Sequence, residues 1–117
     1  MQSEAQAASR CRVDLEQLRT FLEIVRVNSF RQAARNRNRS QPAVSAQIQV
    51  LEKALNTPLF KRYGNRFSLT QTGTVYVRYA KRILNLHEQA LEEMAKACAL
   101  ASHNGRGSEG ASVVSGK

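Results

Sequence analysis

The 117-residue sequence has few residues suited to metal binding, disulfide formation or membrane insertion. Its only cysteines, Cys11 and Cys98, and its only histidines, His87 and His103, are widely separated in the sequence. This spacing predicts no metal site, and two isolated thiols are typical of a reducing cytoplasm. No apolar run approaches the ~18 residues of a membrane span, and residues 1–12 lack the apolar centre of a signal peptide. We therefore expect a cytoplasmic protein with no membrane partner.

Acidic residues are also scarce, with nine Asp and Glu against 18 Lys and Arg, for a net charge of +9. In residues 31–66, Glu52 is the single acid, and the basic residues are Arg31, Arg35, Arg37, Arg39, Lys53, Lys61, Arg62 and Arg66. A solubilising surface would mix both signs, whereas a cluster of one sign is typical of proteins that bind a polyanion. The charge favours nucleic acid over an anionic membrane as the partner.

Residues 39–55, which read RSQPAVSAQIQVLEKAL, have the pattern of a helix with two different faces. Ser40 is suited to cap its first turn, and Pro42 to lie within that turn because proline has no N–H to leave unpaired. An apolar stripe at helical spacing is formed by Val44, Ile48, Leu51 and Leu55. The opposite face carries Gln41, Pro42, Ser45, Ala46, Gln49 and Lys53. Because Gln and Ser can pair with base edges, we predict a DNA recognition helix.

A first helix is predicted over residues 15–27. Its apolar stripe is formed by Leu15, Leu18, Leu22 and Val25. Asp14 is suited to cap this helix, and Asn28 to end it in the left-handed conformation.

A short second helix is predicted to begin after Ser29, which has capping-box spacing to Gln32. Its core side would be formed by Phe30, Ala33 and Ala34. The polar turn at residues 36–39 then leads to the recognition helix. Two helices joined by so short a turn indicate a helix-turn-helix.

After the recognition helix, residues 58–60 and 67–69 have the pattern of two short strands. Gly64 and Asn65 are suited to the positive φ angles of a hairpin turn. The tip carries Lys61, Arg62, Tyr63 and Arg66. We predict a basic wing and favour contact with phosphate or the minor groove over a merely solvated loop.

Thr70 is expected to cap a long helix that runs to about residue 100. Such a helix of ~30 residues extends ~45 Å, which is more than a small domain needs to cover its core. We therefore expect a heptad seam that pairs with a second copy of the chain, formed by Val77, Ala80, Leu84, His87, Leu91, Met94 and Cys98. Packing within the chain is the alternative. His87 is interpreted as a polar seam residue that sets helix register rather than a metal ligand.

Six motifs occur in order: LEQLRTF at 15–21, SFRQAA at 29–34, SQPAVSAQI at 40–48, LE at 51–52, PLF at 58–60 and LTQTG at 69–73. Together they make residues 13–101 resemble the N-terminal DNA-binding domain of LysR-type transcriptional regulators. The resemblance implies a mainly α fold, a winged helix-turn-helix of three helices plus a two-stranded wing, followed by a long linker and dimerisation helix. The two-lobed sensor domain of that family does not occur in these 117 residues.

The chain is accordingly expected to divide into a disordered leader (1–12), a winged helix-turn-helix domain (13–69), a linker and dimerisation helix (70–101) and a flexible tail (102–117), whose composition is rich in Gly and Ser.

The resemblance also implies residue roles. Ser29 would cap the second helix and touch phosphate, Gln41, Pro42, Ser45 and Gln49 would face the major groove, and Arg62 and Arg66 would be wing contacts. With their basic and polar neighbours, the expected DNA-binding residues are Ser29, Arg31, Arg37, Arg39, Ser40, Gln41, Pro42, Ser45, Ala46, Gln49, Lys53, Arg62, Asn65 and Arg66.

The sequence departs from the family pattern at three positions. Ala46 stands where the family commonly has Arg, and Ala can only meet a thymine methyl or leave space, so an atypical base preference is expected. Arg37 and Arg39 stand where the family has buried aliphatic residues. An arginine stem can cover apolar surface while its head stays in water. We therefore expect a looser turn, with both heads near DNA phosphates and more sequence-independent affinity.

The leading hypothesis is a nucleoid-associated, dimeric transcriptional regulator that binds partly palindromic promoter sites in double-stranded DNA. A higher assembly is expected only if the full protein carries a sensor domain. The alternative is a sensor-less dimerisation module that interferes with a full-length relative. No enzymatic activity and no cofactor are predicted, because paired carboxylates, a nucleophile–base pair and a metal cluster are not evident.

Overall fold

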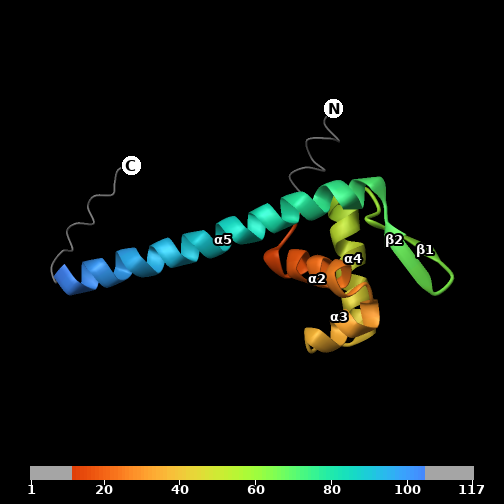
Figure 1. Cartoon of the computed structure of the whole chain (residues 1–117), viewed down its shortest axis with the longest axis horizontal. Coiled ribbons are helices and arrows are strands. Elements are labelled where there is room, and N and C mark those ends of the chain that lie inside the picture. Colours follow the sequence, from red (N-terminus) through yellow and green to blue (C-terminus); the bar gives the residue numbers. More distant parts are fainter. Residues whose placement is uncertain (1–11, 105–117) are drawn as a thin grey trace. The chain divides into compact units, whose positions relative to one another are not determined.

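The computed structural model describes residues 12–104. Its elements are α2 (Leu15–Val27), α3 (Phe30–Asn36), α4 (Gln41–Leu55), β1 (Phe60–Tyr63), β2 (Arg66–Leu69) and α5 (Gln71–Asn104) (Figure 1). This mainly α, winged helix-turn-helix architecture confirms the predicted fold class. Of the predicted leader, only its last residue is described. Of the predicted tail, only residues 102–104 are described, and they continue α5.

The chain forms two compact units, Met1–Leu84 and Asn85–Lys117. The first therefore extends past residue 69, where the DNA-binding domain was predicted to end. The start of α5 belongs to it because Ala80 is fully buried in the core, with Val77 and Leu84 packed against that core. The predicted dimer seam is wrong at Ala80, which has no surface left for a second copy. Val77 and Leu84 are partly buried against the core of their own domain.

The first two helices begin largely as predicted. Asp14 caps α2, and Asn28 ends it with φ 52°. The backbone N–H of Gln17 donates to Asp14 at 2.9 Å, and the Gln17 side chain accepts from the Asp14 N–H at 3.0 Å, so a capping box lies here. At α3, Ser29 accepts from the Gln32 N–H at 2.9 Å. The predicted capping box is wrong in its second half, because the Gln32 side chain donates to Asn36 at 2.8 Å.

Aromatic side chains join the helices to the hairpin. All four phenylalanines form one cluster: Phe60 lies 5.5 Å from Phe21, 5.3 Å from Phe30 and 5.3 Å from Phe67, measured between ring centroids. The remaining core is aliphatic, with buried side chains at Leu18, Ile24, Ala33, Ala34, Val44, Ile48, Leu51, Leu59 and Ala80. Edge-to-face rings contribute packing energy beyond burial alone, so the wing is anchored to the helices rather than merely attached by its ends.

The hairpin pairs Phe60 with Leu69 and Tyr63 with Arg66 in antiparallel register. Gly64 has φ 61°, as predicted, but Asn65 does not have a positive φ. Glycine at the first of two turn residues is the pattern of a type II′ turn, whereas the prediction implied type I′.

At the base of the hairpin, Thr70 caps α5 by accepting from the Gly73 N–H at 2.9 Å. Its hydroxyl also donates to the carbonyl of Pro58 at 2.7 Å.

Candidate nucleic-acid interface

Helix α4 presents the predicted polar face to solvent. Val44, Ile48 and Leu51 are buried and Leu55 is partly buried, which fixes the rotation of the helix. The opposite face leaves Ser45 half-buried and exposes Gln41, Pro42, Ala46, Gln49 and Lys53. Ser40 caps the helix, accepting from the Ala43 N–H at 3.2 Å. The side chains predicted to read bases therefore lie together on one accessible face.

A cleft of about 430 Å³ lies between the start of α3, the first residue of α4 (Gln41) and the wing. It gathers six of the predicted DNA-binding residues: Ser29, Arg31, Gln41, Arg62, Asn65 and Arg66. The other described residues that line it are Asn28, Phe30, Gly64 and Phe67, so none is acidic. The fold thus brings α3, α4 and the wing around one cationic hollow.

The position of Arg62 in this cleft is set by an aromatic ring. Its guanidinium lies 4.5 Å from the centroid of Phe30, within the range of a cation–π interaction. Phe30 in turn packs edge-on against Phe67, 4.9 Å away. The Arg62 guanidinium therefore packs on a ring that the protein core holds in place. The Arg62 side chain itself stays exposed to solvent.

Two shallower hollows lie along α4. One, of about 370 Å³, includes Gln49 and Lys53 in its lining. The other, of about 320 Å³, includes Arg39 and Ala46.

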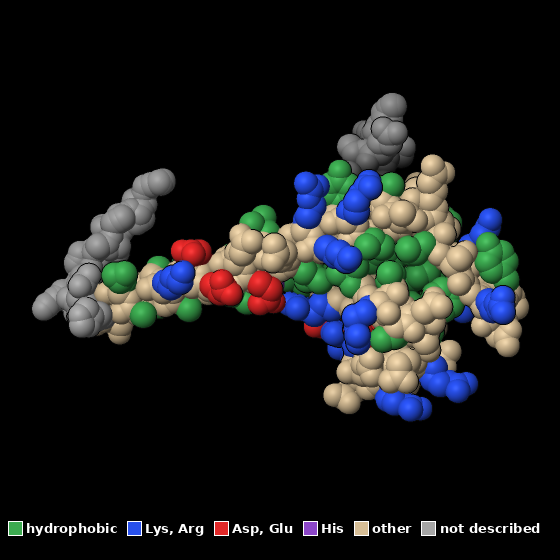
Figure 2. Space-filling view, in the orientation of Figure 1, with side chains coloured by type: hydrophobic (Ala, Val, Ile, Leu, Met, Phe, Trp, Pro, Cys, Tyr) green, Lys and Arg blue, Asp and Glu red, His purple; other side chains and the backbone are tan. Residues whose placement is uncertain are grey.

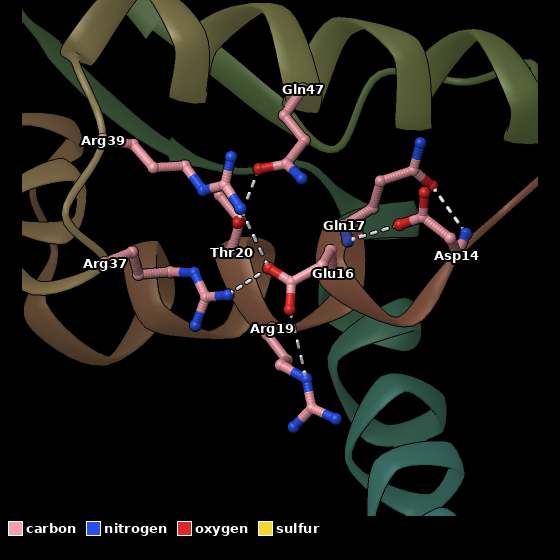
Figure 3. Close-up of polar contacts among 8 residues, drawn as sticks. All are labelled: Asp14, Glu16, Gln17, Arg19, Thr20, Arg37, Arg39 and Gln47. Carbon is pink, nitrogen blue, oxygen red and sulfur yellow. Dashed lines mark hydrogen bonds and ion pairs between the residues drawn. The ribbon is translucent and has the colours of Figure 1, made fainter.

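The turn before α4 is tighter than the sequence predicted. The Arg37 N–H donates to Ala33 and the Arg39 N–H to Ala34, both at 2.9 Å, and Asn38 lies between them with φ 57°. Both arginine heads point to Glu16 of α2 (Figure 3), which accepts a close hydrogen bond from Arg37. The expectation of a loose turn is wrong, because this ion pair ties the turn to α2 where the family has aliphatic contacts.

Two acidic groups of the helix-turn-helix are paired with its own arginines. Glu16 pairs with Arg37 and Arg39. Glu23 accepts from Arg26 and Asn36, which lowers its pKa to about 2. In Figure 2, exposed Lys and Arg side chains lie over the helices and hairpin of the first unit. The charge left for a partner is therefore positive.

In residues 12–104 no group of His, Cys, Asp and Glu is arranged to hold a metal ion. Nor is any helix in that range long and apolar enough to cross a membrane. Cys98 is exposed as a free thiol, while Cys11 lies outside the described residues.

Residues 15–74 match the family described as bacterial regulatory helix-turn-helix protein, lysR family. The chain belongs to this family. Among relatives of this lysR-family chain is the probable RuBisCO transcriptional regulator of Cyanidioschyzon merolae, 51% identical over 83 residues, covering 68% of this chain and 27% of the relative. The protein of the same name from Emiliania huxleyi is 48% identical over 83 residues, with 68% and 26% covered. The lysR-family chain thus spans about a quarter of these relatives' length.

Solved structures of lysR-family proteins share its fold. A crystal structure of Vibrio fischeri DarR in complex with DNA matches with a TM-score of 0.73 and 30% identity, over 76% of this chain and 30% of that one. The crystallised complex of the CbnR DNA-binding domain with DNA matches with a TM-score of 0.70 and 28% identity, over 74% of this chain and 99% of that one.

Two features of this lysR-family interface were not predicted from the sequence. One is Glu16 as the partner of the turn arginines, from which it is 21 and 23 residues away. The other is Thr20, fully buried, which donates to the Gln47 side chain at 2.6 Å and so ties α2 to α4. No local pattern would have found either, since each depends on how the helices cross.

Proposed function

We propose that this chain binds double-stranded DNA and regulates transcription, with α4 in the major groove and the wing at the neighbouring backbone. The observation that carries the proposal is the exposed face of α4 beside a cleft whose described lining has cations and no acid. A helix of this width fits the major groove, and arginines at its edge suit phosphate. The DNA complexes of DarR and CbnR, and the regulators among the relatives, support the same function.

Within this proposal the residues divide by chemistry. Gln41, Ser45 and Gln49 carry groups that donate to and accept from base edges, so they would read sequence. Arg31, Arg62 and Arg66 would bind phosphate, as would the Ser29 hydroxyl. Lys53 would add a phosphate contact from the end of α4. Ala46 would lie against a thymine methyl or leave that base pair unread.

Titration of DNA duplexes under increasing salt tests the proposal. Binding should weaken steeply as salt rises, because phosphate contacts release counterions. Gln41→Ala and Ser45→Ala should reduce discrimination between selected and mixed-sequence duplexes, by about 1–3 kcal/mol for each lost base contact. Arg66→Ala should instead weaken binding to all duplexes and reduce the salt slope by about 1. Gln89→Ala, an exposed position of α5 in the second unit, is the matched control. Unchanged discrimination in both α4 variants would show that this face does not read bases.

We also propose that the second unit pairs two copies of the chain. Its described helix exposes large apolar side chains, including Leu86 (65%), Leu91 (51%) and Met94 (56%). His87 is half-buried and Cys98 exposed on the same segment. Of the predicted seam, His87, Leu91, Met94 and Cys98 retain surface for a partner, whereas Leu86 was not part of that prediction. A dimer would favour partly palindromic sites with half-sites about one helical turn or a multiple apart.

Sedimentation of the purified chain tests this pairing. Leu91→Glu should shift the chain to monomer, whereas Gln89→Glu places the same charge at another exposed position of the segment and should not. A wild-type chain that stays monomeric while it co-purifies with a full-length relative and binds DNA weakly would favour the interference module instead.

A further inference from the structure

One carboxylate on α2 faces three arginines, two of which come from the turn before the recognition helix. Glu16 lies 3.7 Å from Arg19 and 3.4 Å from Arg39, and it forms a closer pair with Arg37 (Figure 3). Three arginines therefore share this one carboxylate, and Arg39 is one of them.

The two turn arginines are held differently. The Arg37 side chain is 21% exposed, and its Nε is buried without a hydrogen-bond partner in the described residues. The Arg39 side chain is 43% exposed, and its contact to Glu16 is long for a hydrogen bond. Moving the Arg37 head would break a close, half-buried pair, whereas Arg39 can exchange its partner at small cost.

Arg39 also lies beside the face proposed to meet DNA. It lines one shallow hollow with Ala43, Ala46, Gln47 and Val50 of α4. Gln17 and the capping residue Asp14, whose carboxylate accepts from the Gln17 N–H, line its other side. Ala46 is the position at which the family resemblance leads one to expect Arg. The side chain missing from α4 thus leaves space next to a guanidinium that comes from the turn.

We propose that Arg39 binds a DNA backbone phosphate beside Ala46, and that Glu16 competes with the DNA for this arginine. The inference rests on the proposed DNA binding and adds an acidic residue that limits affinity. In the free chain the Glu16 carboxylate pairs with the Arg39 guanidinium. When DNA binds, a phosphate replaces this carboxylate as the partner of Arg39, while Arg19 and Arg37 stay paired with Glu16. Because phosphate contacts carry no sequence information, Glu16 would lower sequence-independent affinity and so favour discrimination.

The test uses the full chain and a short duplex of mixed sequence, titrated at several salt concentrations. Glu16→Gln should bind this duplex about three- to tenfold more tightly near 0.1 M salt and steepen the salt slope by about 1, the effect of roughly one further phosphate contact. Arg39→Gln should bind more weakly, with a slope shallower by about 1. The double variant should match Arg39→Gln, because Arg39 is the only one of the three arginines that lines the hollow beside Ala46.

Glu93→Gln is the control for net charge, since Glu93 is an exposed carboxylate of the second unit paired with Lys96. An equal gain in this control would overturn the inference, as would a Glu16→Gln variant that folds but binds with unchanged slope. If Glu16→Gln does not fold, Arg39→Gln decides alone: it keeps the Glu16–Arg37 pair, and an unchanged slope overturns the inference. A wild-type chain that binds no duplex would instead overturn the proposed function itself.

Discussion

The backbone N–H of Leu59 donates a hydrogen bond to Oε2 of Glu52 at 2.7 Å, and the same oxygen accepts from the Phe60 N–H at 3.2 Å. The single acid of the basic segment therefore joins the last turn of α4 to the first residue of β1. Since Leu59 is fully buried, its N–H has little access to water as an alternative partner. The bond sets where the wing begins relative to α4.

Glu52→Ala should lower the free energy of unfolding by about 1–3 kcal/mol, because two backbone donors lose a charged acceptor. Urea denaturation of the wild type and variant measures this difference. Glu52→Gln retains a side-chain oxygen and should cost less. Glu92→Ala, at an exposed position of α5, should change stability by no more than about 0.5 kcal/mol. An equal effect of both alanine variants would show that the Glu52 contact contributes nothing.

Gly73→Ala should destabilise the chain although alanine is the better helix former. A Cβ at Gly73 would overlap the carbonyl oxygen of Leu59 and lie 2.9 Å from Leu69. The overlap should cost about 3 kcal/mol, which outweighs the gain of about 1 kcal/mol in helix propensity. Thermal unfolding followed by circular dichroism measures the result.

Gly64→Ala is the matched comparison, since a Cβ at Gly64 meets no described atom within 4 Å and only the positive φ opposes it. Its cost should be about 1–2 kcal/mol. A smaller loss at Gly73 than at Gly64 would contradict the close approach of α5 to Leu59 and Leu69.

The Glu23 pair should make stability depend on pH under acidic conditions. Arg26 and Asn36 hold the pKa of Glu23 at about 2, below its ordinary value of 4.5. Because the pKa of Glu23 is lowered in the folded state, its interactions add to the free energy of unfolding at pH values above the ordinary pKa. This stabilisation is lost as the pH falls toward about 2. Solvent screening keeps it within about 1 kcal/mol. The free energies of unfolding of the wild type and Glu23→Gln, measured by urea denaturation, should therefore differ at neutral pH and converge near pH 2. A constant difference at every pH would exclude this linkage.

Thr20→Val should lower stability by about 1–2 kcal/mol, because Gln47 Oε1 loses the donor that it has at 2.6 Å. Combining it with Gln47→Met should recover most of the loss, since replacing both partners of a hydrogen bond by apolar groups can be nearly neutral. A double-mutant cycle by urea denaturation measures the coupling. Purely additive losses would show that the two side chains do not interact in solution.

Local patterns predicted most of the fold correctly. The bounds of α2, the cap at Ser40, the buried stripe of α4 and the wing with Gly64 at its turn follow from spacing and backbone preference within a few residues. Such signals are carried by neighbours in the sequence, so they need no knowledge of the tertiary structure.

Contacts between residues far apart in the sequence could not be predicted from these local patterns. Ala80 fits a heptad column as well as a core position, and only its contact with the other helices made it a core residue. Arg37 and Arg39 are charged turn residues by sequence, yet the approach of α2 gives both of them Glu16 as a partner.

By itself, the sequence determined the helix-turn-helix, its basic charge and the polar face of α4, because periodicity and composition specify which side of each element is apolar. The tertiary structure decided which cations remain available to a partner, because a long side chain pairs with whichever group the fold brings within reach. It also decided how far the domain extends into α5, since burial is a property of packed neighbours and not of a repeat in the sequence.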